Sequence, residues 1–180
     1  QLPTQIEKLE LSNLYINDIS KLINFSNLQD LELSYINSDK ITGLEVINQL
    51  PNLKTLMIRS INSIEDIEFL NNNETIENLY ISNSVIKDIT DISTMKNLKS
   101  IDIFWNNIQD MSVLENSPLI TEYMNISQNL VIENQEIEEG QTIEIELPQT
   151  VKCCFDSNSS FHMEDAKITG ITPAVFTFNG

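Results

Sequence analysis

The chain has 180 residues, of which 41% are hydrophobic and 21% charged, and its formal net charge at pH 7 is −17. This composition is typical of a globular protein with room for one sizeable core, or for a repeat array followed by a small domain. The negative charge argues against nucleic acid and anionic membrane surfaces as partners, because both are themselves negative. No segment approaches the roughly 20 apolar residues that span a bilayer, so we expect no membrane insertion.

A short apolar pattern recurs along most of the chain. Each copy has an apolar residue, two variable residues, a second apolar residue, one variable residue and a third apolar residue. The five copies begin at Ile6, Leu28, Leu53, Ile76 and Leu98 and are separated by 22, 25, 23 and 22 residues. A period of this size indicates stacked units that each bury an apolar face against their neighbours. Each triplet predicts a short parallel strand whose last two apolar residues point inward.

A second motif, apolar-x-Asp-apolar, follows four of the five triplets. Its acidic residues are Asp18, Asp66, Asp88 and Asp110. An Asp at this point can cap a short 3₁₀ or helical turn by accepting hydrogen bonds from free backbone N–H groups. The same residues could be interpreted as a ladder of metal ligands, but capping explains them more simply. We therefore expect neither a metal nor a cofactor.

The pattern weakens after the fifth copy. A degenerate sixth copy is predicted with Thr121, Met124 and Ile126 in its apolar positions, which aligns Tyr123 with Ser100 on the outward side of the sheet. Terminal repeats usually diverge in sequence because they must cover the end of the core.

From about residue 130 the repeat gives way to alternating apolar and polar residues, as in half-buried strands. Residues 142–147 and 175–178 are two of the expected strands. We therefore divide the chain into a repeat domain, residues 1–131, and a small β-rich domain, residues 132–180.

The repeats resemble the leucine-rich repeat family, in its roughly 22-residue form found in internalin-like bacterial surface proteins and in the phosphatase regulator SDS22. The family pattern L-x-x-L-x-L-x-x-N-x-I-x-D-I is visible from Leu98 through Asn106 to Leu114. The resemblance implies a right-handed α/β solenoid with a parallel concave sheet and short 3₁₀ or helical turns on its convex side. It also implies that residues 132–180 form an immunoglobulin-like domain or part of one.

The sequence departs from the family pattern at its Asn position. This position holds Leu14, Ile36, Ile61 and Ser84 before it becomes Asn at Asn106 and Asn129. The side-chain ladder that normally binds backbone groups in these turns is therefore missing from the first half. We expect longer, irregular turns there, because the second repeat carries about three extra residues and the third carries one.

Outward residues of the strands form the concave face, which is the default binding surface of a solenoid. The candidate ligand-binding residues are Glu32, Tyr35, Met57, Arg59, Tyr80, Asp102, Phe104, Trp105 and Tyr123. Exposed Trp, Tyr and Arg are the residue types most enriched in interface hot spots. In the alternative interpretation Phe104 and Trp105 fold over the strand end and pack on the solenoid or on the C-terminal segment.

Catalysis has little support in the sequence. Motifs of serine hydrolases, zinc proteases and phosphate-binding loops are absent, and only four glycines occur. Cys154 and His162 could face each other across a hairpin, but no residue orients the histidine and none completes a zinc site. We expect an incidental pair and no enzyme activity. The two cysteines, Cys153 and Cys154, are adjacent, which excludes a disulfide framework.

By resemblance we expect a monomeric, non-enzymatic recognition module of a secreted or surface-attached bacterial protein. It would bind a partner protein, such as a host or surface protein, through its concave face, with leader and anchor absent from this chain. An intracellular SDS22-like regulatory scaffold and a structural spacer are the alternatives.

Overall fold

The computed structural model describes residues 5–108, 110–115, 117, 120, 122–123, 143–144 and 176–177. By its internal contacts the chain divides into two units, Gln1–Leu130 and Val131–Gly180. The boundary expected from the sequence, between residues 131 and 132, lies outside the described residues. In the described part of the chain no helix is long and apolar enough to cross a membrane.

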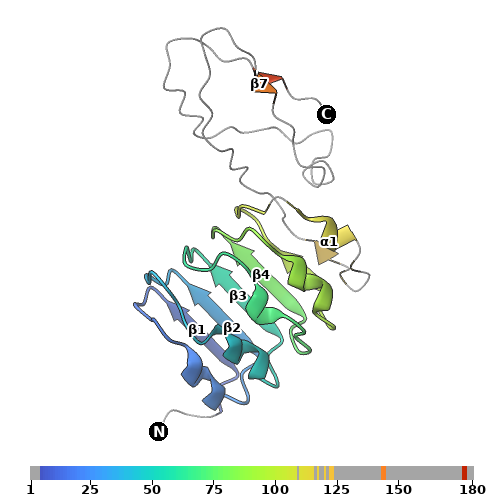
Figure 1. Ribbon diagram of the computed structural model, residues 1–180. Helices are drawn as coiled ribbons and strands as arrows, with labels where there is room; N and C mark the ends of the chain where they lie inside the picture. Colours follow the sequence, from blue (N-terminus) through green and yellow to red (C-terminus); the bar gives the residue numbers. More distant parts are fainter. Residues whose placement is uncertain are drawn as a thin grey trace. The chain divides into compact units, whose positions relative to one another are not determined.

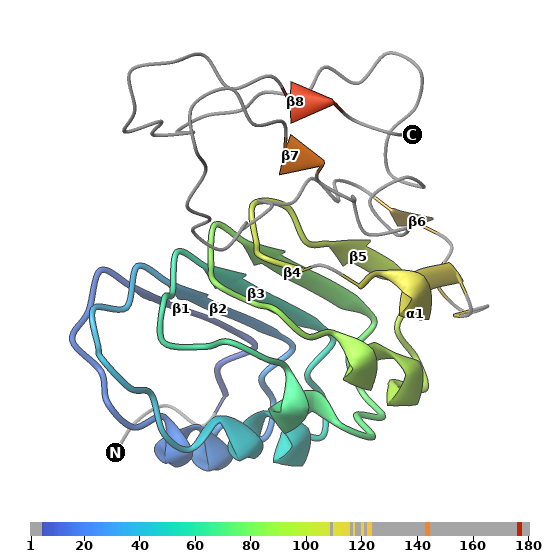
Figure 2. The same ribbon diagram turned by 45° about the horizontal axis from the view of Figure 1, so that its top comes forward.

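The first unit is built on one parallel sheet. Its strands are β1 (Lys8–Ser12), β2 (Asp30–Ser34), β3 (Thr55–Arg59), β4 (Asn78–Ser82), β5 (Ser100–Asp102) and β6 (Glu122–Tyr123). They lie in chain order and each pairs in parallel with the next, as Figure 1 and Figure 2 show for the first five. Each crossover therefore advances the chain by one strand, which is the topology of a solenoid.

Short helical turns return the chain from one strand to the next. They are η1 (Ser20–Asn24), η2 (Leu44–Gln49), η3 (Glu68–Leu70), η4 (Thr90–Thr94) and α1 (Ser112–Glu115). In Figure 2 they line up on the side of the solenoid opposite the strands. The expected parallel sheet with short 3₁₀ or helical turns is confirmed.

The core lies between the sheet and the turns. Leu31, Leu56, Leu79 and Ile101 stand in register across β2 to β5, and each is at most 1% exposed. Burying a side chain of this size contributes roughly 1.5–3 kcal/mol. In the first repeat the matching Leu9 is only half-buried. The core is therefore more completely shielded from solvent in the central repeats than in the first repeat.

Asp residues cap four of the helical turns. Asp18, Asp88 and Asp110 each accept a hydrogen bond from the backbone N–H two residues further on, at 2.8 Å, and Asp66 does so at 3.0 Å. The capping interpretation is confirmed. Among the described residues no group of three or more His, Cys, Asp or Glu side chains could hold a metal ion.

The second repeat has no Asp in this turn and uses a glycine beside it. Thr42 pairs with Asp18 in an isolated bridge, and Gly43 follows with a φ of 77°. A Cβ atom on Gly43 would lie 2.7 Å from both Asp18 Oδ1 and the Ser20 backbone nitrogen. Both the left-handed backbone and the close approach therefore require glycine.

A residue after each of the first five strands has a left-handed backbone; it follows β1 to β4 directly and lies three positions past the end of β5. These residues are Asn13, Tyr35, Ser60, Asn83 and Trp105, with φ between 50° and 56°. In four of them, Asn13, Tyr35, Ser60 and Asn83, the backbone N–H donates to a carbonyl of the following repeat, at 3.0 to 3.1 Å. We call these five residues the left-handed column.

Repeat length varies mainly between the left-handed column and the capped turn. Asn83 stands five positions before Asp88, Ser60 six positions before Asp66, and Tyr35 seven positions before Thr42. The extra residues of the second and third repeats therefore fall largely in these loops, in agreement with the longer turns expected there.

The family Asn position is filled differently in early and late repeats. Ile36 and Ile61 are buried there, and Ser84 donates to the Ser82 carbonyl at 3.2 Å while accepting from the Ile61 N–H at 3.3 Å. Asn106 is fully buried and donates to the carbonyls of Ile81 and Phe104, at 2.9 and 3.2 Å. Apolar packing thus replaces the polar ladder in the second and third repeats, whereas Leu14 at this position of the first repeat is 41% exposed. Asn129 lies outside the described residues.

The expected alignment of the sixth repeat is wrong by one residue. β6 pairs Glu122 with Ser100 and Tyr123 with Ile101, so Tyr123 stands in the inward column. Ile120, which is buried, then stands 22 residues after Leu98 and takes the first apolar position. Tyr123 and its neighbour Met124 could each fill the second apolar position of the repeat, the position of Ile101. The sequence pattern alone therefore admits both alignments.

In the second unit the structure describes two short strands, β7 (Ile143–Glu144) and β8 (Phe176–Thr177), which pair in parallel. They lie within the predicted strand segments 142–147 and 175–178. The immunoglobulin-like interpretation of residues 132–180 stays a prediction, since the rest of this unit is outside the described residues.

Candidate binding surface on the concave face

A row of four candidate residues crosses the concave face. Glu32, Met57, Tyr80 and Asp102 are paired partners on β2, β3, β4 and β5, and all four are partly exposed. They stand side by side because the sheet is parallel and in register, so the same position of every strand faces the same way. We call these four residues the concave row.

Arg59, the only arginine of the chain, lies beside this row at the end of β3. Its Nε atom is 4.0 Å from Glu32 Oε1, and its Nη2 atom is 3.6 Å from Met57 Sδ. The side chain thus lies over the first half of the concave row. At this separation and exposure the ion pair with Glu32 contributes little to stability.

The Asp102 carboxyl is partly buried. Burial raises the pKa of its carboxyl above the ordinary value, and this outweighs the positive charge of Arg59 and a backbone hydrogen bond from Phe104. Its Oδ1 atom is buried without a hydrogen-bond partner.

Phe104 and Trp105 form an aromatic pair at the end of β5. Their ring centroids are 5.3 Å apart in an edge-on arrangement, and Trp105 remains 56% exposed. The buried side-chain amide of Asn106 donates a hydrogen bond to the Phe104 carbonyl at 3.2 Å. Trp105 therefore packs against its neighbour and still presents more than half of its surface to solvent.

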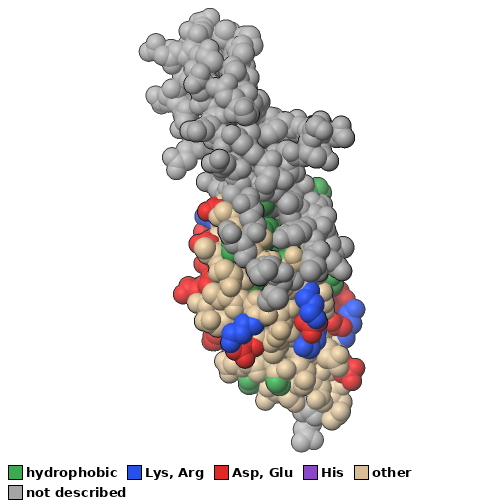
Figure 3. Space-filling view, turned by 90° about the vertical axis from the view of Figure 1, so that its right-hand side faces the viewer, with side chains coloured by type: hydrophobic (Ala, Val, Ile, Leu, Met, Phe, Trp, Pro, Cys, Tyr) green, Lys and Arg blue, Asp and Glu red, His purple; other side chains and the backbone are tan. Residues whose placement is uncertain are grey.

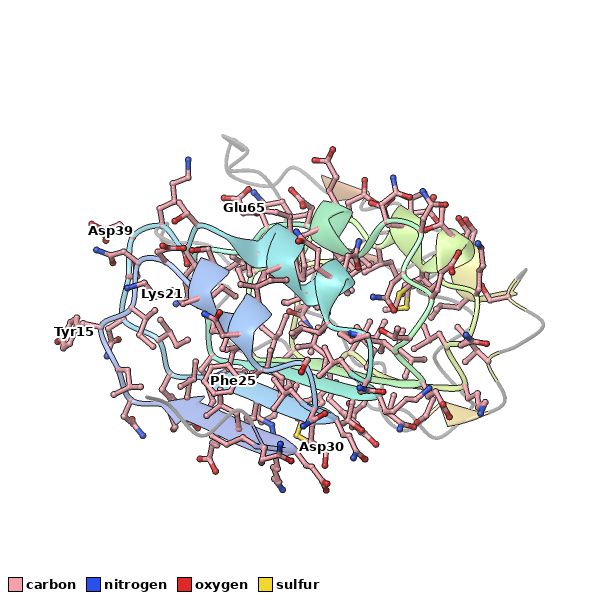
Figure 4. The ribbon with its side chains drawn as sticks, turned by 90° about the horizontal axis from the view of Figure 1, so that it is seen from below. Tyr15, Lys21, Phe25, Asp30, Asp39 and Glu65 are labelled. Carbon is pink, nitrogen blue, oxygen red and sulfur yellow. The ribbon has the colours of Figure 1, made fainter. Side chains whose placement is uncertain are left out.

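Tyr35 occupies the place equivalent to Trp105 three repeats earlier. It is 53% exposed and belongs to the left-handed column. Tyr15 is still more exposed, at 86%, and points away from the solenoid on its outer side in Figure 4, where the Phe25 side chain lies inside. Tyr15 is an exposed aromatic residue outside the concave row, which makes it a natural control.

Several charged side chains elsewhere on the solenoid are paired between repeats. Glu77 lies 2.8 Å from Lys54 and 2.7 Å from Lys99, and hydrogen bonds from these lysines lower its pKa to about 2. Glu65 pairs with Lys87 at 2.7 Å, and Glu74 pairs with Lys96. On the surface facing the viewer in Figure 3, basic side chains accordingly lie against acidic ones.

Three features of this surface escaped the sequence analysis. The left-handed conformation of Tyr35 and Trp105 was signalled only by Asn13 and Asn83 in the same column, since Asn tolerates this backbone best. The Glu77 ladder was signalled by Lys54 and Lys99, one repeat to either side. The buried, unpaired acceptor of Asp102 left no trace in the sequence, because it depends on packing.

Two predicted groups are not part of the surface. Tyr123 stands in the inward column by its register, and its side chain is not among those described. Cys154 and His162 lie outside the described residues, so their expected incidental pairing stays a prediction.

Comparisons with known proteins agree with this architecture. No family model matches the chain. The protein SUPPRESSOR OF npr1-1, CONSTITUTIVE 1 of Arabidopsis thaliana is 32% identical over 117 residues, which cover 63% of this chain and 8% of that protein. The chain thus spans a small part of the relative that it matches.

Among solved structures, internalin C2 of Listeria monocytogenes superposes with a TM-score of 0.55 at 23% identity, over 71% of this chain and 55% of its own. A second Listeria monocytogenes internalin, inlF, gives a TM-score of 0.38 at 20% identity, over 64% and 46% of the two chains. The superposition on internalin C2 shows a shared fold. With the period, the sheet and the turns described above, this likeness shows that the first unit has the fold of a leucine-rich repeat solenoid, similar to that of internalin C2.

Proposed function

We propose that the chain is a non-enzymatic recognition module that binds a partner protein through the concave face of its solenoid. The observation that carries this proposal is the concave row, which places Met57 and Tyr80 at the centre of a continuous sheet face with Arg59 beside them. Hot spots of protein interfaces are enriched in Tyr, Trp and Arg at such central positions. By resemblance to internalins, we place the protein in a secreted or surface-attached bacterial setting, with a host or surface protein as partner.

Partner capture with matched variants tests this function. The full chain is immobilised and exposed to cell-surface proteins, and retained proteins are identified by mass spectrometry. Tyr80→Ala and Trp105→Ala should each weaken binding of the retained partner by more than about tenfold. Tyr15→Ala removes a still more exposed aromatic side chain from outside the concave row and should leave binding unchanged.

Circular dichroism melting of each variant verifies that the solenoid is folded. A partner held equally by the wild type, Tyr80→Ala and Trp105→Ala would refute the concave face as the binding surface. A chain that captures no partner at all would support the structural spacer instead.

A further inference from the structure

The acids on the concave face are poorly matched by bases. Four acids point outward from three strands: Glu10 from β1, Asp30 and Glu32 from β2, and Asp102 from β5. The basic residues at outward positions of these strands and of β3 are Lys8 and Arg59. In the described part of the chain no base lies within 4.0 Å of Glu10, Asp30 or Asp102, and Glu32 has only Arg59, at 4.0 Å. This contrasts with the lysine pairs of Glu65, Glu74 and Glu77 elsewhere on the solenoid.

Aromatic side chains accompany the acids at both ends of the concave row. Glu32 on β2 is followed by the exposed Tyr35, and Asp102 on β5 by Phe104 and the exposed Trp105. A surface that presents both carboxylates and exposed aromatic rings suits lysine or arginine side chains, which can make charge contacts with the carboxylates and cation–π contacts with the rings. Arg59 shows that a guanidinium already fits between Glu32 and the Met57 sulfur.

The strand spacing sets the distance between the two acids at the ends of the concave row. Glu32 and Asp102 lie three strand spacings apart, which is about 14 Å at the usual spacing of parallel strands. An extended chain covers about 13 Å in four residues, and residues four apart point to the same side. Between the two ends stand Met57 and Tyr80, together with the positive charge of Arg59, which disfavours a third basic residue at the centre.

We infer that the partner presents an extended basic segment, laid across the strands, with two lysine or arginine residues four positions apart that contact Glu32 and Asp102. This inference rests on the proposed function, because it names the chemistry of the ligand of the same face. Positive charge on the ligand also complements the net charge of −17 of the whole chain, which would accelerate the encounter.

The only tryptophan of the chain, Trp105, provides the readout. A short synthetic peptide with two lysines four positions apart is titrated into the full chain at low salt while tryptophan fluorescence is followed. We expect a saturable change that weakens as salt is added. The same peptide with both lysines acetylated, and one with the lysines three positions apart, should bind about tenfold more weakly or worse.

Charge-removing variants locate the contacts. Glu32→Gln and Asp102→Asn should each weaken binding of the two-lysine peptide by about three- to tenfold. Glu45→Gln on η2 removes the same charge from an exposed residue of the opposite side and should leave binding unchanged. Equal binding of the acetylated peptide, equal effects of all three variants, or no fluorescence change up to millimolar peptide would each overturn the inference.

The two proposals fail separately. A captured partner that is lost with Tyr80→Ala but is retained by both Glu32→Gln and Asp102→Asn overturns the basic segment and leaves concave-face recognition standing. A captured partner that is unaffected by Tyr80→Ala and Trp105→Ala overturns concave-face recognition, and the basic segment with it.

Discussion

At the scale of single residues, the left-handed column shows where this chain accepts backbone strain. Asn13 and Asn83 are suited to a positive φ, because Asn tolerates this conformation better than other residues with a Cβ atom. Tyr35 and Trp105 adopt the same conformation with bulky side chains, which costs of order 1 kcal/mol each. Both residues are more than half exposed, so packing in the core does not repay that cost. Strain retained in exposed aromatic residues next to the concave row is consistent with a role in binding.

Replacing Tyr35 with Asn should therefore stabilise the fold. We expect the free energy of unfolding to rise by about 0.5–1 kcal/mol, because Asn relieves the strained backbone and little buried surface is lost. Urea unfolding followed by circular dichroism measures the change. The reverse substitution in the same column, Asn13→Tyr, should lower stability by a similar amount. A clear loss of stability in Tyr35→Asn would mean that the tyrosine ring supports the loop.

At the scale of elements, the repeats are joined by side chains one period apart. The ladder of Lys54, Glu77 and Lys99 stands just before β3, β4 and β5, and the N–H groups of Glu77 and Lys99 each donate to the carbonyl of the preceding ladder residue. Ion pairs this exposed contribute little individually and are screened by salt. Because these three residues recur once per repeat, the ion pairs nevertheless favour the observed alignment of adjacent repeats over shifted alignments.

The pKa of Glu77 gives this ladder a pH dependence. Because the folded-state pKa is lowered from 4.5 to about 2, the ionised carboxylate stabilises the folded chain above pH 4.5, and this contribution is lost as the pH falls towards 2. Glu77→Gln should therefore be less stable than the wild type at pH 7, and the difference should shrink through this window and in high salt. Urea midpoints measured across the window provide the check.

Glu45→Gln serves as the matched control for this series, since Glu45 is exposed on η2 and forms no ion pair in the described part of the chain. A difference between the wild type and Glu77→Gln that persists unchanged at pH 2 would show that the ladder stabilises through packing of its side-chain stems.

At the scale of the whole molecule, the inward apolar columns could be predicted from the sequence, whereas the register of the terminal strand β6 could not. Leu31, Leu56 and Leu79 could be assigned to the core because burial of one face imposes the same apolar spacing on every repeat. The one-residue error at β6 arose where the strand is two residues long and Tyr123 and Met124 compete for one position. The concave row followed from the register, whereas the raised pKa of Asp102 depends on three-dimensional surroundings that no spacing reveals.

Core stability should vary along the solenoid. Leu56→Ala in the fully buried column of β3 should lower the free energy of unfolding by about 3 kcal/mol, through lost burial and the cavity left behind. Leu9→Ala occupies the same column in β1, where the side chain is half-buried, and should cost about half as much or less. Urea unfolding compares the two. Equal losses would indicate that β1 is as tightly packed as the centre.

The variable loops between the left-handed column and the capped turns have a practical meaning. The strand, the left-handed residue after it and the helical turn keep the same order in each of the first five repeats. The loop between Tyr35 and Thr42 is already two residues longer than the shortest loops. Foreign sequence inserted between Asn37 and Lys40 should therefore be displayed without disturbing the strands on either side. This loop is the place at which the scaffold can be engineered to carry an epitope or an affinity tag.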